Sequence, residues 1–566
     1  MMRIFKPLKN KIPSMIVIGI FLVISAYCSL TLPQYTAEII DVGIKNSDIP
    51  CILDIGTKMM MMVLIAALSS VIVSFLSSRV SSGYAKDLRN IVYAKILKFS
   101  NHELNHISKS SLITRSTNDI TQIQTITEMT LTTIIFAPIL GFGSVIKVFQ
   151  VDYDLSWIIF VIFILILLTL VLFVKKVVPY LDAFQKITDE MNQRSREILM
   201  GIPVIKAFVR QDYEEEKFGD VNKRLLDLNL YLYKYLMLFS PLLILILNIM
   251  VIEIIYFGSF QIAVGDILTG EVVSFVQYSS QVISAFLVIG NFMITLPRII
   301  ISARRVNEIL DTELAITDGE LDNIEDNATI EFKNVSYQYP GSEKETLKGI
   351  NMKLEPGKTT AIIGGTGSGK STILSMIPRL QDPTSGEILI NGVNIKNFTL
   401  SSLRDKISFA PQQSLLLSGT VRSNMLVGKQ DASDQEIETA LKNAHVNFID
   451  GLDEEVVQGG ANFSGGQKQR LSIARALLNP SEFYLFDDCF SALDMNTEKI
   501  VKDNLKKLNS SVLIVSQRIS TIRDADEIIV VEDGEIVDRG SHDSLLGSCE
   551  IYRDIVDSQK DTLGGI

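Results

Sequence analysis

The chain is poor in the residues that bind structural metals or form disulfides. Its 566 residues include only four histidines and four cysteines, and no two cysteines form a CxxC pair. We therefore expect neither a disulfide framework nor a cysteine-based metal site. Positive charge is also scarce relative to negative charge, because the formal net charge is −11 at pH 7. This balance argues against nucleic acid as a partner, since nucleic-acid-binding domains present basic surfaces.

Charged residues are rare in several long runs of the first 300 residues. A helix needs roughly 20 apolar residues to cross a bilayer, and six runs are long enough to do so. The first run does not fit a cleaved signal peptide, because it is too long and leads into Pro33 without a small-residue cleavage site. We predict membrane spans near residues 13–33, 57–80, 129–149, 155–178, 237–258 and 272–297.

Lysine and arginine are nearly missing from the segments on one side of these spans. Residues 34–56 contain only Lys45, and residues 259–270 contain neither lysine nor arginine. The N-terminal segment and the long segments 80–128 and 179–236 are instead rich in both. Positive charge marks the cytoplasmic side of a membrane protein. We therefore predict a multi-pass protein with both ends in the cytoplasm.

The two long cytoplasmic segments have few helix breakers, which predicts helices that continue the membrane spans. Each contains a candidate docking element, at residues 106–119 and 201–214, and the alternative for both is a solvated charged helix. Glu253 lies inside the fifth predicted span, where a charge costs about 2.5–3.5 kcal/mol on insertion scales. Two interpretations stay open: Glu253 faces a cavity as a contact for cations or a protonatable group, or it lies near the outer interface with its carboxylate in water.

The sequence pattern changes after residue 305. A polar, acidic stretch at residues 306–328 predicts a linker, and short apolar strands separated by turns follow it. We therefore predict a membrane domain at residues 1–305, a linker at residues 306–328 and a second domain at residues 329–566.

A glycine-rich loop follows the buried strand predicted at residues 361–363. It matches the pattern GxxxxGK[ST] between this strand and a helix predicted to begin near Thr372. Its backbone N–H groups are expected to hold phosphate oxygens, Lys370 to reach the β- and γ-phosphates of ATP, and Ser371 to bind Mg²⁺. The alternative is an ordinary glycine-rich turn. The loop consists of Gly364, Gly365, Thr366, Gly367, Ser368, Gly369, Lys370, Ser371 and Thr372.

A second glycine-rich segment opens a helix further along the chain and predicts a second anion site. One ATP is not expected to occupy both sites of a compact domain, so the second site is expected to serve a nucleotide held by another copy or a partner. Its residues are Ser464, Gly465, Gly466 and Gln467.

Two other segments contain candidates for contacts with a nucleotide. Tyr339 follows a predicted strand, where its ring could stack on adenine or pack in the core. The apolar run at residues 483–486 ends in Asp487 and Asp488. A buried strand that ends in two acids has the arrangement of an ATPase metal-and-base site.

In this order the motifs resemble those of ATP-binding cassette (ABC) transporters. Over essentially the whole chain, the arrangement is similar to an exporter half-transporter with six spans and one nucleotide-binding domain. The resemblance implies ATP and Mg²⁺ as ligands, Tyr339 as the adenine-stacking residue, and Gln412 and Asp487 beside Ser371 at the metal. It also implies that residues 464–467 are the signature motif, residues 491–494 the D-loop, and the two docking elements the coupling helices.

The resemblance also defines the expected fold class. It is a polytopic α-helical membrane domain, with six transmembrane helices and long cytoplasmic extensions, followed by an α/β P-loop ATPase domain with a helical subdomain.

Two positions of the predicted ATP site depart from the family pattern. The family usually has glutamate as the base after the strand acid and histidine as the switch residue, whereas this chain has Asp488 and Gln517. The shorter aspartate withdraws its carboxylate by about 1.5 Å. A glutamine can donate a hydrogen bond to phosphate but cannot take up a proton or carry a positive charge. Together the changes favour a degenerate ATP site that is slow or inactive; the alternative is a slower homodimer.

The signature motif is intact apart from Phe463, which replaces the usual leucine before it. A weak Walker site beside an intact signature is similar to one subunit of heterodimeric bacterial multidrug exporters. The resemblance implies a plasma-membrane exporter of hydrophobic or amphipathic compounds, in contact with membrane lipids and a second half-transporter. The alternatives are a homodimeric or heterodimeric lipid or peptide exporter, or a membrane regulator that ATP gates without pumping. We see no peptidase domain before the first span, which argues against a peptide-processing exporter.

Overall fold

The computed structural model of the chain describes residues 4–152 and 155–560, and the chain forms two compact units. The helical unit comprises the chain up to Leu97 together with Lys109–Thr312, and the α/β unit comprises Lys98–Ser108 and the chain from Glu313 onward. The predicted boundary at residue 305 is an expectation from sequence, and the two compact units divide between Thr312 and Glu313. Residues 98–108 of the first cytoplasmic segment belong to the α/β unit.

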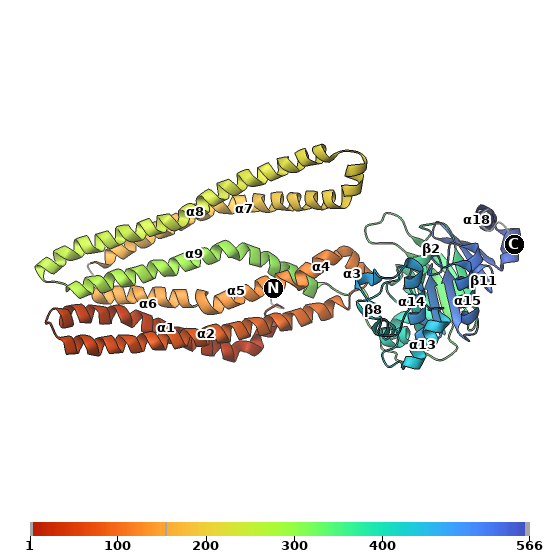
Figure 1. Cartoon of the computed structure of the whole chain (residues 1–566), viewed down its shortest axis with the longest axis horizontal. Coiled ribbons are helices and arrows are strands. Elements are labelled where there is room, and N and C mark those ends of the chain that lie inside the picture. Colours follow the sequence, from red (N-terminus) through yellow and green to blue (C-terminus); the bar gives the residue numbers. More distant parts are fainter. Residues whose placement is uncertain (1–3, 153–154, 561–566) are drawn as a thin grey trace. The chain divides into compact units, whose positions relative to one another are not determined.

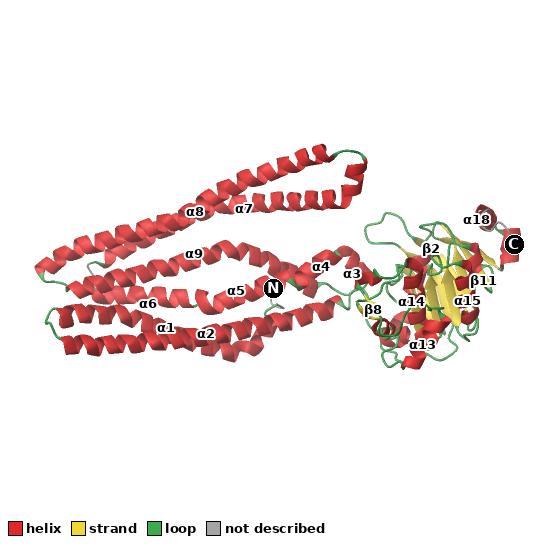
Figure 2. Ribbon diagram, viewed as in Figure 1, coloured by secondary structure: helices red, strands yellow, loops and turns green. Residues whose placement is uncertain are grey.

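Long helices make up the helical unit (Figures 1 and 2). Six helical segments in the described part of the chain are long and apolar enough to cross a membrane, which confirms the predicted number of spans. The longest helix, α8, has 54 residues. It is about 80 Å long, far more than the roughly 30 Å of a bilayer core. The elements are η1 (Lys6–Lys11), α1 (Ile12–Glu38), η2 (Ile39–Ile44), α2 (Ile49–Ile96), α4 (Lys109–Ser116), α5 (Asn118–Met129), η3 (Thr130–Ile134), α6 (Phe136–Val151), α7 (Ser156–Ala207), α8 (Gln211–Val264) and α9 (Thr269–Asp311).

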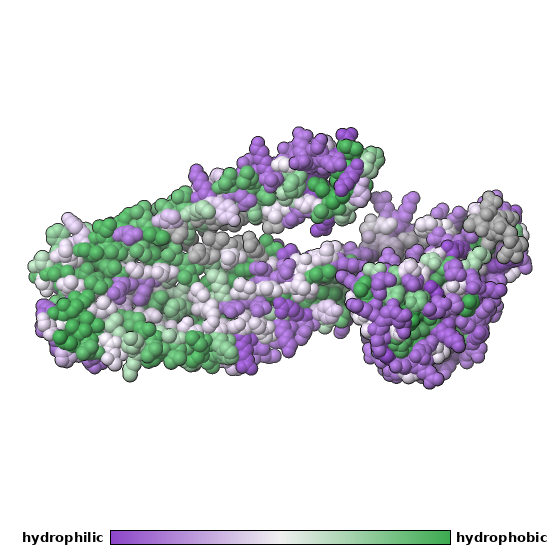
Figure 3. Space-filling view, viewed as in Figure 1, coloured by the Kyte–Doolittle hydropathy of each residue, from purple (hydrophilic) through white to green (hydrophobic). Residues whose placement is uncertain are grey.

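Large apolar side chains cover much of the outer surface of the helical unit. Leu68, Val71 and Phe142 are 64%, 68% and 74% exposed. In Figure 3, hydrophobic residues dominate the end of this unit that lies away from the α7–α8 turn, and hydrophilic residues gather at that turn. An apolar surface of this extent marks contact with lipid or protein, and its position on the candidate spans fits a lipid-facing surface.

Two carboxylates hold α9 near its two ends. At its start, Asp41 on η2 accepts a hydrogen bond from the backbone N–H of Gly270 at 2.7 Å. Near its end, buried Asp119 on α5 accepts from Ser302 Oγ at 2.9 Å and pairs with Arg305 Nη2 at 2.7 Å. These contacts fix α9 against segments that are distant in the sequence.

The structure shows the local conformation of the predicted linker, the two docking elements and Glu253. Helix α9 continues to Asp311, so the first six residues of the predicted linker 306–328 are helical. The first docking element, residues 106–119, includes α4 and the start of α5, and the second, residues 201–214, includes the end of α7 and the start of α8. Glu253 is half-buried on α8 beside the buried Ile254.

A six-stranded sheet in the order β12-β11-β3-β10-β9-β6 lies at the centre of the α/β unit. All neighbours are parallel except β11 and β12. Strands β9 and β10 are buried along their whole length, which is typical of parallel strands covered on both faces. The carboxyl ends of the parallel strands therefore share one edge. The strands are β3 (Thr359–Ile363), β6 (Ile407–Ala410), β9 (Phe483–Asp487), β10 (Ser511–Val515), β11 (Glu527–Glu532) and β12 (Glu535–Gly540).

Smaller sheets and short helices complete the α/β unit. An antiparallel sheet has the order β2-β1-β4-β5, and β7 pairs with β8. These strands are β1 (Ile330–Tyr337), β2 (Leu347–Leu354), β4 (Ser385–Ile390), β5 (Val393–Asn394), β7 (Gly419–Thr420) and β8 (Glu455–Val456). The helices are α3 (Asn101–His106), α10 (Lys370–Met376), η4 (Ile395–Asn397), α11 (Leu400–Asp405), α12 (Val421–Met425), α13 (Asp434–Asn443), η5 (Gln458–Gly460), α14 (Gly465–Leu478), α15 (Met495–Leu505), α16 (Ile519–Ile522), α17 (His542–Ser548) and α18 (Glu550–Lys560).

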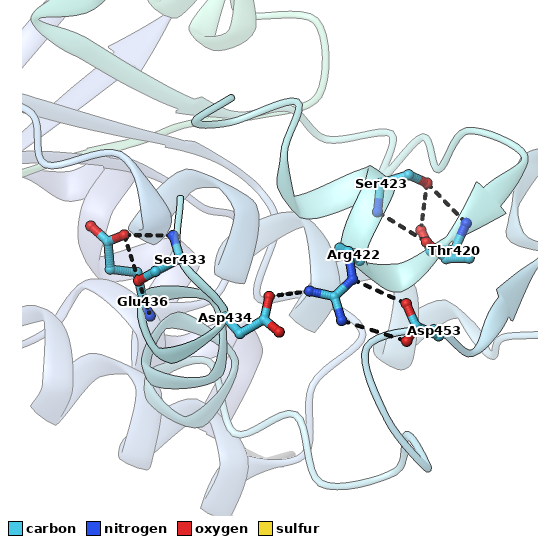
Figure 4. Close-up of polar contacts among 7 residues, drawn as sticks. All are labelled: Thr420, Arg422, Ser423, Ser433, Asp434, Glu436 and Asp453. Carbon is cyan, nitrogen blue, oxygen red and sulfur yellow. Dashed lines mark hydrogen bonds and ion pairs between the residues drawn. The ribbon is translucent and has the colours of Figure 1, made fainter. Parts of the chain in front are cut away.

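A polar cluster joins the short helices between β6 and α14 (Figure 4). Arg422 on α12 pairs with Asp434 at the start of α13, and its Nε lies 3.0 Å from Asp453 Oδ1. Helix α13 begins with a capping box in which Ser433 and Glu436 satisfy each other's backbone N–H groups. The cluster holds α12, α13 and the loop before β8 together, which positions the helical subdomain that carries α14.

Within the α/β unit, the buried Glu103 joins α3 to the segment after α9. Its Oε2 accepts hydrogen bonds from the backbone N–H and the hydroxyl of Ser100, and its Oε1 accepts from the backbone N–H of Ala315 at 2.6 Å. Burial tends to raise the pKa of this carboxyl, but the hydrogen bonds from Ser100 and Ala315 outweigh burial, so the pKa lies below its ordinary value. The ionised form is therefore the one that holds the two segments together.

We expect Glu103→Ala to release α3 from Ala315. Hydrogen bonds to a charged group each contribute about 1.5–3 kcal/mol, so hydrogen exchange of the Ala315 amide should accelerate roughly 10–100-fold in the full-length protein. Because the folded pKa is depressed, the contribution is complete above the carboxyl's unfolded pKa and disappears as the pH falls through the folded value. Asn105→Ala, on an exposed position of the same helix, is the control. Unchanged exchange in Glu103→Ala would contradict this role.

Candidate nucleotide-binding site

The predicted phosphate-binding residues meet where the parallel strands of the central sheet end. Strand β3 leads into the loop at residues 364–369, β9 ends at Asp487, and β10 is followed by Ser516 and Gln517. This edge is where open α/β sheets bind ligands. A pocket of about 270 Å³ opens there. Its lining residues are Tyr339, Thr346, Thr366, Gly367, Gly369, Lys370, Ser371, Thr372, Gln412, Asp487, Asp488, Val515 and Gln517.

Glycines give the loop a backbone shape that other residues would not adopt. Gly367 and Gly369 have φ angles of 86° and 94°, in the left-handed region that favours glycine. At Gly364 a Cβ atom would lie 1.9 Å from the carbonyl oxygen of Val531. The loop is therefore an open cradle beside the start of α10, which begins at Lys370, two residues earlier than predicted.

Lys370 is buried inside this cradle. Its Nζ donates to the carbonyl oxygens of Gly364 and Gly365 at 2.9 and 2.6 Å and to Ser368 Oγ at 3.3 Å. Burial lowers the pKa of Lys370, while the nearby carboxylates Asp488 and Asp487 oppose that shift. An ammonium group held among carbonyls can exchange these contacts for phosphate oxygens, which accept charge-assisted hydrogen bonds.

Ser371 and Asp487, which we predict to bind the metal ion, are in direct contact. Ser371 Oγ donates to Asp487 Oδ1 at 2.9 Å, and Gln412 lines the same pocket. Burial raises the pKa of Asp487, and the hydrogen bond from Ser371 opposes the rise. Across residues 4–152 and 155–560, no cluster of three or more His, Cys, Asp or Glu side chains could hold a metal ion. The donors fit Mg²⁺, which proteins bind through hard oxygens from one or two carboxylates together with nucleotide phosphates.

Asp488 follows β9 with an unusual backbone conformation. Its φ angle is 45°, in the left-handed region that aspartate and asparagine enter more readily than longer side chains. Its backbone N–H donates to the carbonyl oxygen of Val515 at 2.9 Å. Burial raises the pKa of the carboxyl, and hydrogen bonds from the Gln517 backbone and the Gln412 side chain oppose the rise. The short acid thus suits this turn, which is a local reason for aspartate that the sequence pattern does not reveal.

Tyr339 and Gln517 lie on the rim of the pocket. The Tyr339 hydroxyl is 3.2 Å from Thr372 Oγ1 at the start of α10, and its ring meets that of Tyr337 edge to face. Stacking of Tyr339 on adenine remains a prediction. Gln517 is exposed, and the γ-phosphate contact expected of it is a prediction as well.

The structure does not bring residues 464–467 to this pocket. Ser464 caps α14 in a capping box with Gln467, so the glycines open a helix as predicted. Gln469 on α14 accepts from the backbone N–H of Ala492 at 2.9 Å and donates to Ser491 Oγ at 3.3 Å. The signature helix is therefore connected to the segment that follows Asp488, within one chain.

The pocket also contains residues that the sequence reasoning missed. Thr346 and Val515 line it without belonging to a recognised motif. The backbone N–H of Thr346 donates to the carbonyl oxygen of Tyr337 at 2.7 Å, which places Thr346 beside the segment that carries Tyr339. No signal in the sequence marks either position, because each is brought there by pairing between strands.

Comparisons with known proteins agree with this arrangement. The family described as "ABC transporter transmembrane region" matches residues 15–286, and the family "ABC transporter" matches residues 347–491. An uncharacterized ABC transporter ATP-binding protein of Mycobacterium tuberculosis is 35% identical, with 96% of each chain covered. An uncharacterized ABC transporter ATP-binding protein of Bacillus subtilis is 34% identical, with 93% of each covered.

Two further comparisons concern proteins whose names describe an activity. An ATP-dependent lipid A-core flippase of Salmonella typhimurium is 29% identical over 95% of this chain and 94% of its own. The structure of a bacterial Atm1-family ABC exporter with ATP bound has a TM-score of 0.82, with 98% of both chains covered. At 23% identity that likeness concerns the fold alone. The chain belongs to the ABC transporter family, as an exporter-type half-transporter whose transmembrane region and ATP-binding domain are joined in one polypeptide.

Proposed function

We propose that this chain is one half of a heterodimeric ABC exporter of hydrophobic or amphipathic compounds, and that its own Walker site retains ATP with little turnover. The observation that carries the proposal is the presence of Asp488 and Gln517 in the phosphate pocket. These are the positions at which the family places its general base and its switch residue. The site would lie on the cytoplasmic side of the plasma membrane.

The chemistry of the two side chains supports slow hydrolysis. A general base must come within about 2.6–3.2 Å of the proton it takes, directly or through one water, and losing a positioned base costs about 10²–10⁴ in rate. Asp488 is one methylene shorter than glutamate, and Gln517 cannot supply the positive charge that a protonated histidine would place near the terminal phosphate.

ATP binding needs only the groups that contact the phosphates and the metal ion, and these groups match the family pattern. The loop N–H groups and Lys370 would hold the phosphates, while Ser371, Asp487 and Gln412 would hold Mg²⁺. The metal ion, when bound, neutralises charge on the phosphates. The chain could therefore keep ATP in place without cleaving it.

An intact signature helix beside this weak site favours a division of labour between two chains. Phe463, the one departure before the signature, is buried and its ring lies 5.9 Å from that of Phe448. The replacement therefore packs in the helical subdomain and leaves residues 464–467 free of its bulk. We propose that these residues complete the Walker site of the partner, where turnover occurs.

A lipid exporter is the second candidate, because the lipid A-core flippases among the relatives are similar over most of the chain. ATP-driven transport by the purified chain together with its partner, reconstituted in vesicles, distinguishes the candidates. We expect transport of amphipathic dyes. Flipping of labelled lipid without dye transport would favour the second candidate, and no ATP-driven movement of either would favour a regulator.

We expect Lys370→Ala to weaken ATP binding by roughly 10–100-fold, since charge-assisted hydrogen bonds contribute about 1.5–3 kcal/mol each. Equilibrium binding of a fluorescent ATP analogue to the full-length protein measures this. Lys396→Ala removes an exposed lysine of the same unit and should bind as the unchanged protein does. Equal affinity in both variants would show that the pocket is not the nucleotide site.

We expect Asp488→Glu combined with Gln517→His to raise ATP hydrolysis by the full-length chain roughly 10–100-fold, because a positioned base is worth about 10²–10⁴. Asp488→Glu alone should give a smaller gain, because Gln517 would still lack the positive charge that a protonated histidine places near the terminal phosphate. Asp503→Glu with Gln435→His, both at exposed positions, is the control. Brisk hydrolysis by the unchanged chain on its own would refute the degenerate site.

A further inference from the structure

The C-terminal helix α18 contacts the switch segment through one side chain. Gln559 Nε2 donates to the carbonyl oxygen of Gln517 at 2.8 Å, and Gln559 Oε1 accepts from the backbone N–H of Ile519 at 2.9 Å. A primary amide offers one acceptor and one donor side by side. Here it pairs with the backbone of two residues on either side of Arg518, much as a neighbouring strand would.

Helix α18 is anchored firmly enough to hold this contact in place. Tyr552 is fully buried and Val556 nearly so, and both pack in the same core as Ile519. The Tyr552 hydroxyl lies 2.8 Å from His542 Nδ1 on α17. Positions 552, 556 and 559 follow the i, i+4, i+7 spacing of one helix face. Gln559 thus lies on the same helix face as the buried Tyr552 and Val556. An apolar residue at this position could pack there but could not make the two hydrogen bonds.

The segment that Gln559 holds reaches the ATP pocket. Gln517 and Asp488 line the same pocket. The carbonyl group of Gln517 is the one that Gln559 holds. A shift of this carbonyl would turn the peptide and redirect the Gln517 side chain.

We propose that Gln559 is a positioning residue of the ATP site, which directs the Gln517 side chain toward the terminal phosphate of bound ATP. The proposal rests on ATP binding in this pocket. The C-terminal helix α18 would then affect nucleotide binding indirectly, because it contributes no residue to the lining of the pocket. The release rate of ATP, which has a terminal γ-phosphate, would depend on α18. The release rate of ADP, which lacks that phosphate, would not.

The difference between ATP and ADP supplies the test. Gln559→Met keeps the length and packing of the side chain but removes both hydrogen bonds. In the full-length protein in lipid nanodiscs, we expect this variant to release MANT-ATP roughly 3–10-fold faster, as the loss of one or two neutral hydrogen bonds implies. Release of MANT-ADP should stay unchanged. Ser558→Ala, at the exposed neighbouring position on α18, should release both as the unchanged protein does.

A double variant separates positioning from a general structural role. Gln517→Ala should also accelerate release of MANT-ATP, and adding Gln559→Met should then change little, because residues that act through one contact are not additive. Additive effects, or equal acceleration for MANT-ATP and MANT-ADP, would overturn the proposal and leave ATP binding by the pocket intact. Failure of the unchanged protein to bind MANT-ATP would overturn the proposed function and this inference together.

Discussion

The parallel register of β3, β10 and β9 is the constraint on which the nucleotide site depends, and the hydrogen bond between Ser371 and Asp487 is its direct result. This hydrogen bond joins the helix after β3 to the end of β9, two strands separated by β10 in the central sheet. Parallel pairing brings all three strand ends to one edge, so the phosphate loop, the acids and the switch segment meet there without any further device. The pocket, its metal donors and the position of Gln517 all follow from this register.

If the proposed function is right, the same edge would let the site keep its binding groups and lose its turnover. The cradle depends on glycine geometry and on Lys370, and both are intact. Asp488 lies just beyond the strand, where a left-handed backbone suits a short acid. A side chain shorter by one methylene there would lie further from an attacking water, while the groups expected to bind the phosphates would be unchanged. Binding and hydrolysis are therefore separable at neighbouring residues of one turn.

The sequence was sufficient to predict features with strong local signals. Six apolar runs predicted the candidate membrane helices, and the loop ending in Lys370 and Ser371 predicted the strand-loop-helix that carries them. The sequence was insufficient to predict features that depend on packing between distant segments. Three features arise from tertiary contacts. They are the hydrogen bond between Glu103 and Ala315, the position of Thr346 in the pocket, and the hydrogen bond from Gln559 to Gln517. The end of α9 at Asp311 was missed because an acidic, polar helix terminus has the composition of a linker.

We propose that this chain holds ATP at its own Walker site without cleaving it. The measurement that tests this is the identity of the bound nucleotide. The full-length protein is incubated with Mg²⁺ and labelled ATP, and unbound nucleotide is removed. The protein is then denatured, and the released labelled nucleotide is identified by chromatography. We predict that the label is recovered as ATP after many minutes. Recovery as ADP would contradict the account, because Asp488 and Gln517 would then support turnover.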